Sequence, residues 1–315
     1  MTAYRTTLPR IGSHFPAKNT LPPLIFHYTS PTGLLGILQE STLRFTDRQF
    51  MNDVSEYIHI RKPFRIAMEL LKEELKYPYL SEIASALFDH TRSTTELDAT
   101  DESHYYLFCA SVVPDSLGMW NHYIKDRNYQ GYSVGFHVGC LLESFRELSL
   151  PGVSISHGRV IYKEDEQVDL LHHALREVDL EVSQISKDME SVLWDDRRFS
   201  SLAEEILKNR LEEYRLFFKD ESFADEREYR LVLKIPQSAE EQMDRILTKG
   251  YTSKNGLFIP HFDLSFSKEN ALHSIKAAPM IEFQLAKIGL QRFLNDHHYP
   301  VDKIEITQST IPIRF

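Results

Sequence analysis

Hydrophobic positions along the chain follow two spacings, one of about two residues in short segments and one of three to four residues in longer ones. Leu24–Tyr28 is an apolar run of strand length. It is followed by Ser30-Pro31, a pair typical of a helix start, because serine caps free N–H groups and proline fits the first helical position. We therefore expect a helix over 32–39, and then a second strand at Thr42–Thr46, where apolar and polar residues alternate.

The same two patterns predict the remaining elements. Further strands are expected at 105–111, 132–138, 158–162, 229–235, 256–262, 273–277 and 303–307. Further helices are expected from Asn52-Asp53 to Leu71, at 81–90, at Met119–Ile124 and at 281–296, with a polar loop at Thr91–Ser103. Asp115 and Ser116 are the two candidate N-caps of the helix that contains Met119.

Residues 166–216 form the clearest helical stretch, because apolar residues recur three and four positions apart and no proline interrupts them. Strands and helices alternate irregularly along the chain, which favours an α+β fold with a mixed β-sheet. No linker rich in proline, glycine or serine divides the chain after residue 23. We predict an N-terminal arm at 1–23 and a single α+β domain at 24–315, with a helical insertion at about 166–218.

Composition narrows the class of protein. The 315 residues are 42% hydrophobic and 26% charged, as in globular proteins, and carry a formal net charge of −10. This acidity disfavours extensive coating of nucleic acid by charge alone, although it is compatible with a small basic groove. Cys109 and Cys140 are the two cysteines, so a disulfide scaffold and a cysteine zinc module are excluded. Because no apolar run approaches about 20 residues and the N-terminus lacks a signal-peptide core, we expect a cytoplasmic protein without a membrane partner.

Common catalytic motifs are absent from the sequence. The chain has no glycine-rich phosphate loop, no H-E-x-x-H zinc motif and no G-x-S-x-G nucleophile motif. The 14 histidines are dispersed, and His172-His173 and His297-His298 are adjacent pairs. Adjacent residues diverge by about 100° around a helix, so neither pair chelates a metal alone. We therefore expect no metal site.

Polar and aromatic residues instead follow one another within apolar segments. His27 ends the apolar strand at 24–28, where a histidine is either structural or placed to meet a ligand. Trp120 and Tyr123 are three positions apart and so share a helix face, either as core residues or as a wall on which a ligand stacks.

The segment Glu226–Arg230 leads into the strand at 229–235. Alternation with a period of two puts Glu226, Glu228 and Arg230 on one face, with the two carboxylates about 6.5 Å apart along the strand. Either this is a solvated face on which Arg230 bridges the two acids, or Arg230 holds the two carboxylates in a cleft. In a cleft, one carboxylate can stabilise positive charge on a substrate.

Taken together, these segments resemble a widespread bacterial family known only as a domain of unknown function. The resemblance runs from about residue 24 to 314 and is carried, in order, by FHYTS, FMNDVSE, LFCAS, GMWNHY, GYSVGF, FKDESFADEREYR, LFIPHFDL and STIPIR. Ala278-Pro279 stands where the family pattern has Gly-Pro, which affects only a local turn.

The front half of that family is in turn similar to ADP-ribosyltransferases, including toxins that modify DNA or RNA and the RNA 2′-phosphotransferases. These share a histidine at a strand end, an aromatic residue on a central helix and a Glu-x-Glu pair on a late strand. The matching residues here are His27, Tyr123 with Trp120 as its rival, and Glu226-x-Glu228. The resemblance implies an ADP-ribosyltransferase-like fold that uses NAD as a substrate and needs no metal.

The resemblance also implies roles for single residues. Glu228 would stabilise the oxocarbenium character that develops as the nicotinamide–ribose bond breaks. Glu226 would orient the acceptor or help remove its proton, and His27 would donate a hydrogen bond to the ribose or diphosphate of NAD. The residues expected to bind NAD are His27, Tyr28, Thr29, Arg44, Asn52, Trp120, Tyr123 and Arg230.

The expected acceptor of ADP-ribose is a nucleic acid or a protein, with water as the alternative. A short single strand needs only a small basic groove, for which the candidates are Arg44, Arg61, Lys62, Lys125 and Arg127. The resemblance implies a bacterial toxin or phage-defence effector, for which a neutralising antitoxin would be a further partner.

Two other functions fit the same residues. The cleft can belong to a binding module that recognises a nucleotide or an acidic ligand without catalysis, its acids being paired structurally with Arg230. It can also belong to a metal-dependent nuclease that uses Asp53, Glu56, Glu226 and Glu228. Asn52 and Asp53 otherwise serve simply as a helix cap.

Overall fold

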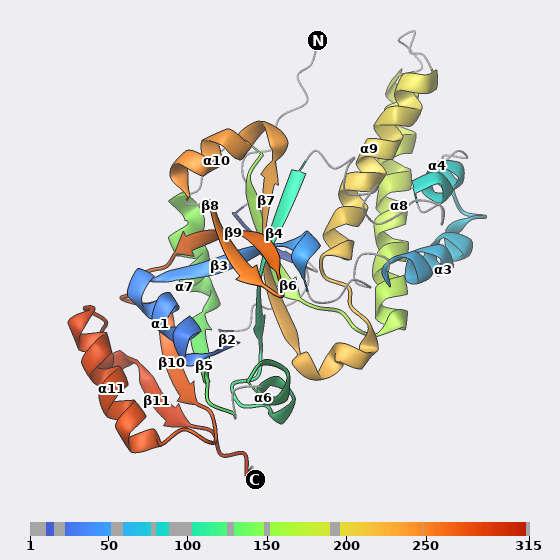
Figure 1. Cartoon of the computed structure of the whole chain (residues 1–315). Coiled ribbons are helices and arrows are strands. Elements are labelled where there is room, and N and C mark those ends of the chain that lie inside the picture. Colours follow the sequence, from blue (N-terminus) through green and yellow to red (C-terminus); the bar gives the residue numbers. More distant parts are fainter. Residues whose placement is uncertain are drawn as a thin grey trace. The chain divides into compact units, whose positions relative to one another are not determined.

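The computed structural model describes residues 11–15, 23–51, 59–76, 80–87, 103–124, 129–147, 152–189, 196–247 and 249–312 (Figure 1). The chain divides into two compact units. The first unit comprises Met1–Met51, Glu102–Arg159 and Asp225–Phe315, and the second comprises Asn52–Asp101 and Val160–Ala224.

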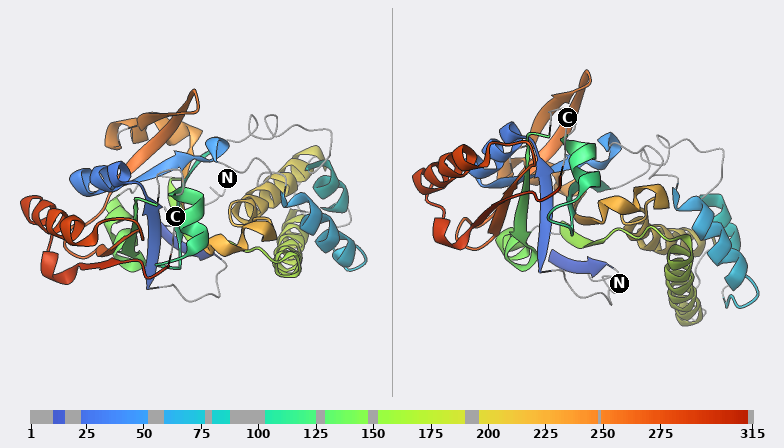
Figure 2. Two further views of the ribbon diagram at one scale, coloured as in Figure 1. Left: turned by 60° about the horizontal axis from the view of Figure 1, so that its bottom comes forward. Right: turned by 90° about the horizontal axis from the view of Figure 1, so that it is seen from below.

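The first unit holds a mixed sheet, which has eleven strands in the described residues. They are β1 (Ile11–Phe15), β2 (Leu24–Thr29), β3 (Thr42–Asp47), β4 (Ser103–Ser111), β5 (Tyr132–His137), β6 (Ser154–Arg159), β7 (Glu228–Pro236), β8 (Lys249–Lys254), β9 (Leu257–Ser265), β10 (Leu272–Ala277) and β11 (Glu305–Gln308). Their order is β1-β6-β7-β4-β2-β5-β10-β11, while β3 pairs with β4 and β9, and β8 pairs with β9. The pairs β1–β6 and β10–β11 are parallel and the others are antiparallel. The orange β8–β9 hairpin extends beyond the other strands (Figure 2).

The described residues of the first unit also form helices. They are α1 (Pro31–Glu40), α6 (Leu117–Tyr123), α7 (Val138–Ser144), α10 (Glu240–Ile246) and α11 (Phe283–Asp296), with short 3₁₀ helices η1 (Arg48–Phe50), η3 (Phe145–Glu147), η5 (Gln237–Ala239) and η6 (Val301–Lys303). Two of these helices begin at a capping residue that the sequence indicates, whereas α7 and α10 were not predicted. Ser30 caps α1 by accepting a hydrogen bond from the Gly33 N–H, and Pro31 starts it, as predicted. Of the two candidate caps of α6, Ser116 is the one that accepts the backbone N–H of Met119.

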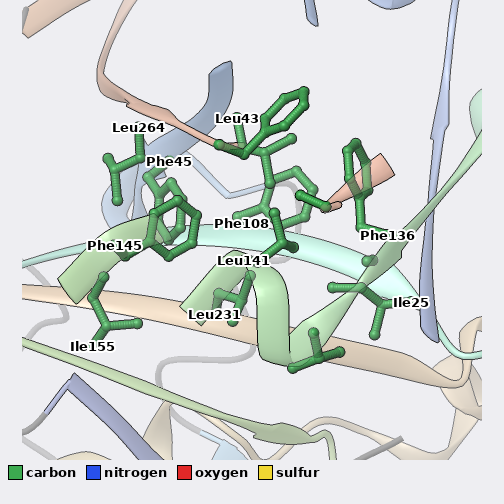
Figure 3. Close-up of a cluster of buried hydrophobic side chains, with 14 of the residues drawn as sticks. Ile25, Leu43, Phe45, Phe108, Phe136, Leu141, Phe145, Ile155, Leu231 and Leu264 are labelled. Atoms are coloured by element: carbon green, nitrogen blue, oxygen red, sulfur yellow. The ribbon is translucent and has the colours of Figure 1, made fainter. Parts of the chain in front are cut away.

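The main core lies on one face of the sheet, where side chains from β2, β3, β4 and β7 converge (Figure 3). Ile25, Phe45, Phe108 and Leu231 are almost fully buried there. Strand β7 is buried along nearly its whole length, and Leu231 lies on its core face, so Glu228 and Arg230, at odd spacing from Leu231, lie on the opposite face. The core thus fixes β7 and the direction of its polar side chains.

The second unit is helical. It contains α3 (Arg61–Leu71), α4 (Leu80–Leu87), α8 (Glu164–Met189) and α9 (Asp196–Arg215), with η4 (Glu221–Glu226) spanning the boundary to the first unit. Helix α8 packs against α3 and α9, and α4 packs against α9. The stretch that we expected to be a helical insertion, 166–218, supplies α8 and α9.

Helices and a mostly antiparallel mixed sheet together make an α+β fold, as the sequence predicts. Several boundaries differ from expectation. Ile11–Phe15, in the segment expected to be an arm, form β1 and pair in parallel with β6, and β6 ends at Arg159, where the expected strand continued to 162. Residues 52–58 and 88–102, expected to start a helix and to form a loop, lie outside the described residues. None of the helices in the described ranges combines the length and apolar character that a membrane crossing needs.

Two glycines of the first unit predict opposite effects of the same substitution. A Cβ on Gly158 would overlap the backbone oxygen of Phe15, whereas Gly36, in the middle of α1, has open space around it. Gly158→Ala should lower the free energy of unfolding by about 1–3 kcal/mol because β1 must shift. Gly36→Ala should raise it by about 0.5–1 kcal/mol because alanine is the better helix former. Urea denaturation of both variants checks this, and equal effects would contradict the close approach of β1 and β6.

Candidate active site

The candidate site is built where the ends of β2 and β4 meet the start of β7. Phe26 on β2 is directly opposite Ser111 on β4, and Ser111 is directly opposite Glu228 on β7. One step further along, Cys109 is opposite Arg230. Directly opposed residues share a sheet face, so Ser111, Cys109, Glu228 and Arg230 lie together on the face away from the main core.

Glu228 and Arg230 form a buried ion pair on this face. The Arg230 Nε donates to Glu228 Oε1 at 2.8 Å and its Nη2 donates to Oε2 at 3.0 Å. Arg230 is 1% exposed and Glu228 is 6% exposed. A two-point guanidinium–carboxylate contact fixes the orientation of both groups. The expected holding of a carboxylate by Arg230 is thus observed for Glu228.

Glu226 is close in sequence but does not share the strand face predicted for it. It ends the 3₁₀ helix η4, and Arg227 between the two acids has a φ of 42°, so alternation begins only at Glu228. Glu226 is nevertheless 7% exposed. Its carbonyl accepts a hydrogen bond from the buried Ser111 Oγ at 2.7 Å, and the Arg227 carbonyl accepts one from the Val112 N–H at 3.0 Å. Glu226 and Glu228 therefore lie on either side of a turn whose backbone is fixed by two hydrogen bonds and which leads into β7.

His27 lies near this pair but on the other side of β4. Its Nδ1 lies 2.9 Å from the carbonyl oxygen of Cys109, the residue opposite Arg230, and its ring packs against Phe108 of the core face. Two strand spacings, about 10 Å, separate β2 from β7. Because a carbonyl can only accept, Nδ1 carries the proton, and burial lowers the pKa of His27, so the neutral ring leaves Nε2 as an acceptor. The Nδ1–H of His27 is therefore not available for the expected donation to ribose or diphosphate, and its ring lies on the core face, opposite to Glu228 and Arg230.

The lowered pKa of His27 predicts a specific acid sensitivity. The contribution of neutral His27 to stability is fully present above about pH 6.5, the unfolded value, and is lost as the pH falls through the lowered folded value. His27→Asn keeps an N–H donor for the Cys109 carbonyl but does not titrate. Between pH 7.5 and 5.5, its free energy of unfolding should fall less than that of the wild type, by up to about 1.4 kcal/mol per pH unit. Urea denaturation at both pH values measures the difference, with exposed His122→Asn as control, and identical slopes would contradict the buried neutral ring.

The two aromatic candidates on α6 differ in burial. Trp120 is 0% exposed, its indole N–H donates to Asp115 Oδ1 at 2.8 Å, and its ring meets the Tyr28 ring edge-on at a centroid distance of 4.7 Å. The Tyr28 hydroxyl donates to the Val113 carbonyl at 2.9 Å. Tyr123 is 43% exposed. Trp120 and Tyr28 thus belong to a small core cluster beside the site, and Tyr123 is the rival that a ligand can reach.

The remaining predicted NAD-binding residues lie in different places. Thr29 ends β2 opposite Tyr132. Arg44 on β3 pairs with Asp263 and donates to Thr252, so its charge is engaged by the β8–β9 hairpin and not by Glu228. Asn52 lies outside the described residues.

The nuclease alternative depends largely on residues outside the described part of the chain. Asp53 and Glu56 lie outside the described residues, as do Lys125 and Arg127 of the candidate basic groove. Within the described ranges, no three His, Cys, Asp or Glu side chains gather closely enough to hold a metal ion. Glu226 and Glu228 alone offer too few ligands for the site that this alternative requires.

Ser111 and Arg227 belong to the site but were not predicted from the sequence. Ser111 is the last residue of an apolar strand, and a polar residue there could have indicated a hydrogen bond to another segment of the chain. The conformation of Arg227 could not be predicted, because nothing in the sequence shows that a residue between two glutamates adopts a left-handed backbone.

Comparison with known proteins places part of the chain in a family context. A family model described as "Protein of unknown function (DUF2971)" matches residues 119–231, which include Glu226, Glu228 and Arg230. Neither the curated proteins nor the solved structures contain a match to the chain. The predicted resemblance to a family of unknown function is therefore supported for this segment. None of the comparisons links the chain to an ADP-ribosyltransferase, so that similarity stays a prediction.

Proposed function

We propose that the chain is an ADP-ribosyltransferase-like enzyme, which cleaves the nicotinamide–ribose bond of NAD and transfers ADP-ribose to a macromolecule. The observation that carries the proposal is the buried Glu228 carboxylate, held at both oxygens by Arg230, while Glu226, two residues earlier in the chain, is also buried. Cleavage of a glycosidic bond develops positive charge on the sugar, and a fixed, desolvated carboxylate is suited to stabilise it.

In the proposed reaction, the bond between ribose C1′ and the nicotinamide nitrogen breaks, and its electron pair leaves with nicotinamide. Glu228 stabilises the resulting charge with a carboxylate that Arg230 orients at both oxygens. A lone pair of the acceptor forms the new bond to C1′, and Glu226 takes the acceptor's proton.

Tyr123 and His27 differ in their part in this proposal. Tyr123 stacks on the nicotinamide ring because it is the exposed aromatic of α6. His27 takes no part in binding NAD in this proposal, because its Nδ1–H is engaged by the Cys109 carbonyl and its ring packs against Phe108 on the core face of the sheet, opposite to Glu228. A cytoplasmic role as a bacterial toxin or phage-defence effector with a neutralising antitoxin belongs to the same proposal and rests on the family resemblance alone.

A binding module without catalysis is the second candidate, and one observation favours it. Arg230 and Glu228 form an ion pair within the chain, and a buried ion pair with a purely structural role has the same geometry. Such a module binds its nucleotide without breaking a bond.

Incubation of the purified chain with NAD distinguishes the candidates. The proposed enzyme releases nicotinamide, measured by liquid chromatography, and the release is unaffected by EDTA. Parallel reactions with radiolabelled NAD, a single-stranded oligonucleotide and a bacterial lysate identify the acceptor. NAD binding without nicotinamide release under every acceptor condition would leave the binding module, and EDTA-sensitive oligonucleotide cleavage would favour the nuclease.

A further inference from the structure

Arg227 has an unfavourable backbone conformation for an arginine. Its φ of 42° lies in the left-handed region, where the Cβ crowds the neighbouring carbonyl. Ser41 and Asn255 also have positive φ, but one ends helix α1 and the other forms the β8–β9 turn, where local structure requires it. Arg227 instead joins η4 to β7, a position at which glycine would be the least strained residue.

The conformation is imposed by contacts on both sides of Arg227. The Ser111 hydroxyl binds the carbonyl of Glu226, and the Val112 N–H binds the carbonyl of Arg227. Strain that surrounding contacts enforce in this way is found preferentially at functional sites. The turn keeps Glu226 and Glu228 buried while the Arg227 side chain is exposed.

The charges around Arg227 select a type of ligand. Its guanidinium makes no hydrogen bond or ion pair with any described residue, although the buried carboxylates of both sequence neighbours lie close by. The buried carboxylates of Glu226 and Glu228 favour a ligand group that carries or develops positive charge. The exposed guanidinium of Arg227 favours an anionic group of the same ligand. Guanidinium binds phosphate oxygens at two points.

We propose that Arg227 is a phosphate-binding residue of the site and that its exposed guanidinium binds a phosphate group of the ligand. The phosphate belongs either to the diphosphate of NAD or to the backbone of a nucleic-acid acceptor. The first source rests on the proposed function, and the second does not.

Arg227→Gly tests the inference because it should change stability and binding in opposite directions. Relief of the left-handed strain should raise the melting temperature by about 1–3 °C. Loss of a charged hydrogen-bond donor should weaken binding about 10–100-fold. The probes are NAD, nicotinamide riboside, which has the same reacting bond but no phosphate, and a 12-nucleotide oligothymidylate, each titrated by calorimetry. Weaker binding of NAD with unchanged binding of the riboside places the diphosphate at Arg227, and a loss confined to the oligonucleotide places the nucleic-acid backbone there.

Three further variants separate strain from charge. Arg227→Ala keeps the strain and removes the guanidinium, so binding should fall without a rise in melting temperature. Arg227→Lys should retain part of the binding. Arg292→Ala removes an exposed arginine from α11 and should change neither quantity. The inference is overturned if wild type binds neither NAD nor the oligonucleotide, or if Arg227→Gly binds both as tightly as wild type. Nicotinamide release by Arg227→Gly at saturating NAD reports on the proposed function separately.

Discussion

Single-turnover nicotinamide release should fall by about 10²–10³-fold in Glu228→Gln, while the dissociation constant of NAD changes little. Glutamine keeps the shape and hydrogen-bonding reach of Glu228 but removes the charge that stabilises the oxocarbenium-like transition state. A group that acts only in the transition state affects turnover far more than binding, and loss of one preorganised stabiliser costs about this factor in rate. Rapid-quench measurement of nicotinamide, with NAD affinity from calorimetry, gives both quantities.

Two variants serve as controls for this result. Glu226→Gln should spare hydrolysis of NAD more than transfer to the acceptor, because its proposed partner is the acceptor. Glu143→Gln removes an exposed carboxylate from α7 and should leave both reactions unchanged. A folded Glu228→Gln protein whose release rate stays within about threefold of wild type, far from the loss expected of such a stabiliser, would remove Glu228 as the catalytic carboxylate.

Arg230→Met should lower the free energy of unfolding by about 3–5 kcal/mol, because it removes the guanidinium that binds both oxygens of the buried Glu228 carboxylate. The double variant Glu228→Gln with Arg230→Met also removes the buried negative charge and should recover a large part of the loss. Urea denaturation of the two single variants and the double variant measures the coupling between the two side chains.

The matched control is a second two-point arginine–carboxylate pair that is exposed. Arg44 donates to both oxygens of Asp263, and its side chain is 51% exposed, so Arg44→Met should cost at most about 1 kcal/mol. Strict additivity of the Glu228 and Arg230 variants would contradict the ion pair as the determinant of stability.

Much of the sheet could be predicted because its strands and their side-chain directions are local properties. The alternation of Glu228, Arg230 and Leu231 on β7 followed from a period of two, and the start of α1 followed from Ser30-Pro31. Strand β8 was missed because Lys249–Lys254 is polar and half-exposed, so its hydrophobic pattern is weak. Strand β1 was missed because its pairing with β6 depends on residues far along the chain.

The candidate site was predictable in its residue types and less so in its geometry. The apolar pattern put His27 at a strand end, but it could not show the hydrogen bond to Cys109, which joins residues 82 positions apart. Helical spacing put Trp120 and Tyr123 on one face, and could not show that packing against Tyr28 buries Trp120 completely. The predicted strand alternation from Glu226 onward was wrong because Glu226 ends η4 and the left-handed Arg227 separates it from β7, and no pattern of apolar residues indicates such a residue.

The pairing of β6 with β7 has a consequence for how the protein reaches its folded state. These neighbours are antiparallel, as in a hairpin, yet the chain from Val160 to Arg227, including α8 and α9, takes the place of the turn. Closing such a long loop costs entropy before any contact of the two strands repays it, and such non-local contacts slow folding. During synthesis, the edge of β6 that pairs with β7 stays unpaired until the ribosome has synthesised β7. The carboxylates at the start of β7 therefore acquire their arrangement late, and a partly synthesised chain has no means to carry out the proposed reaction.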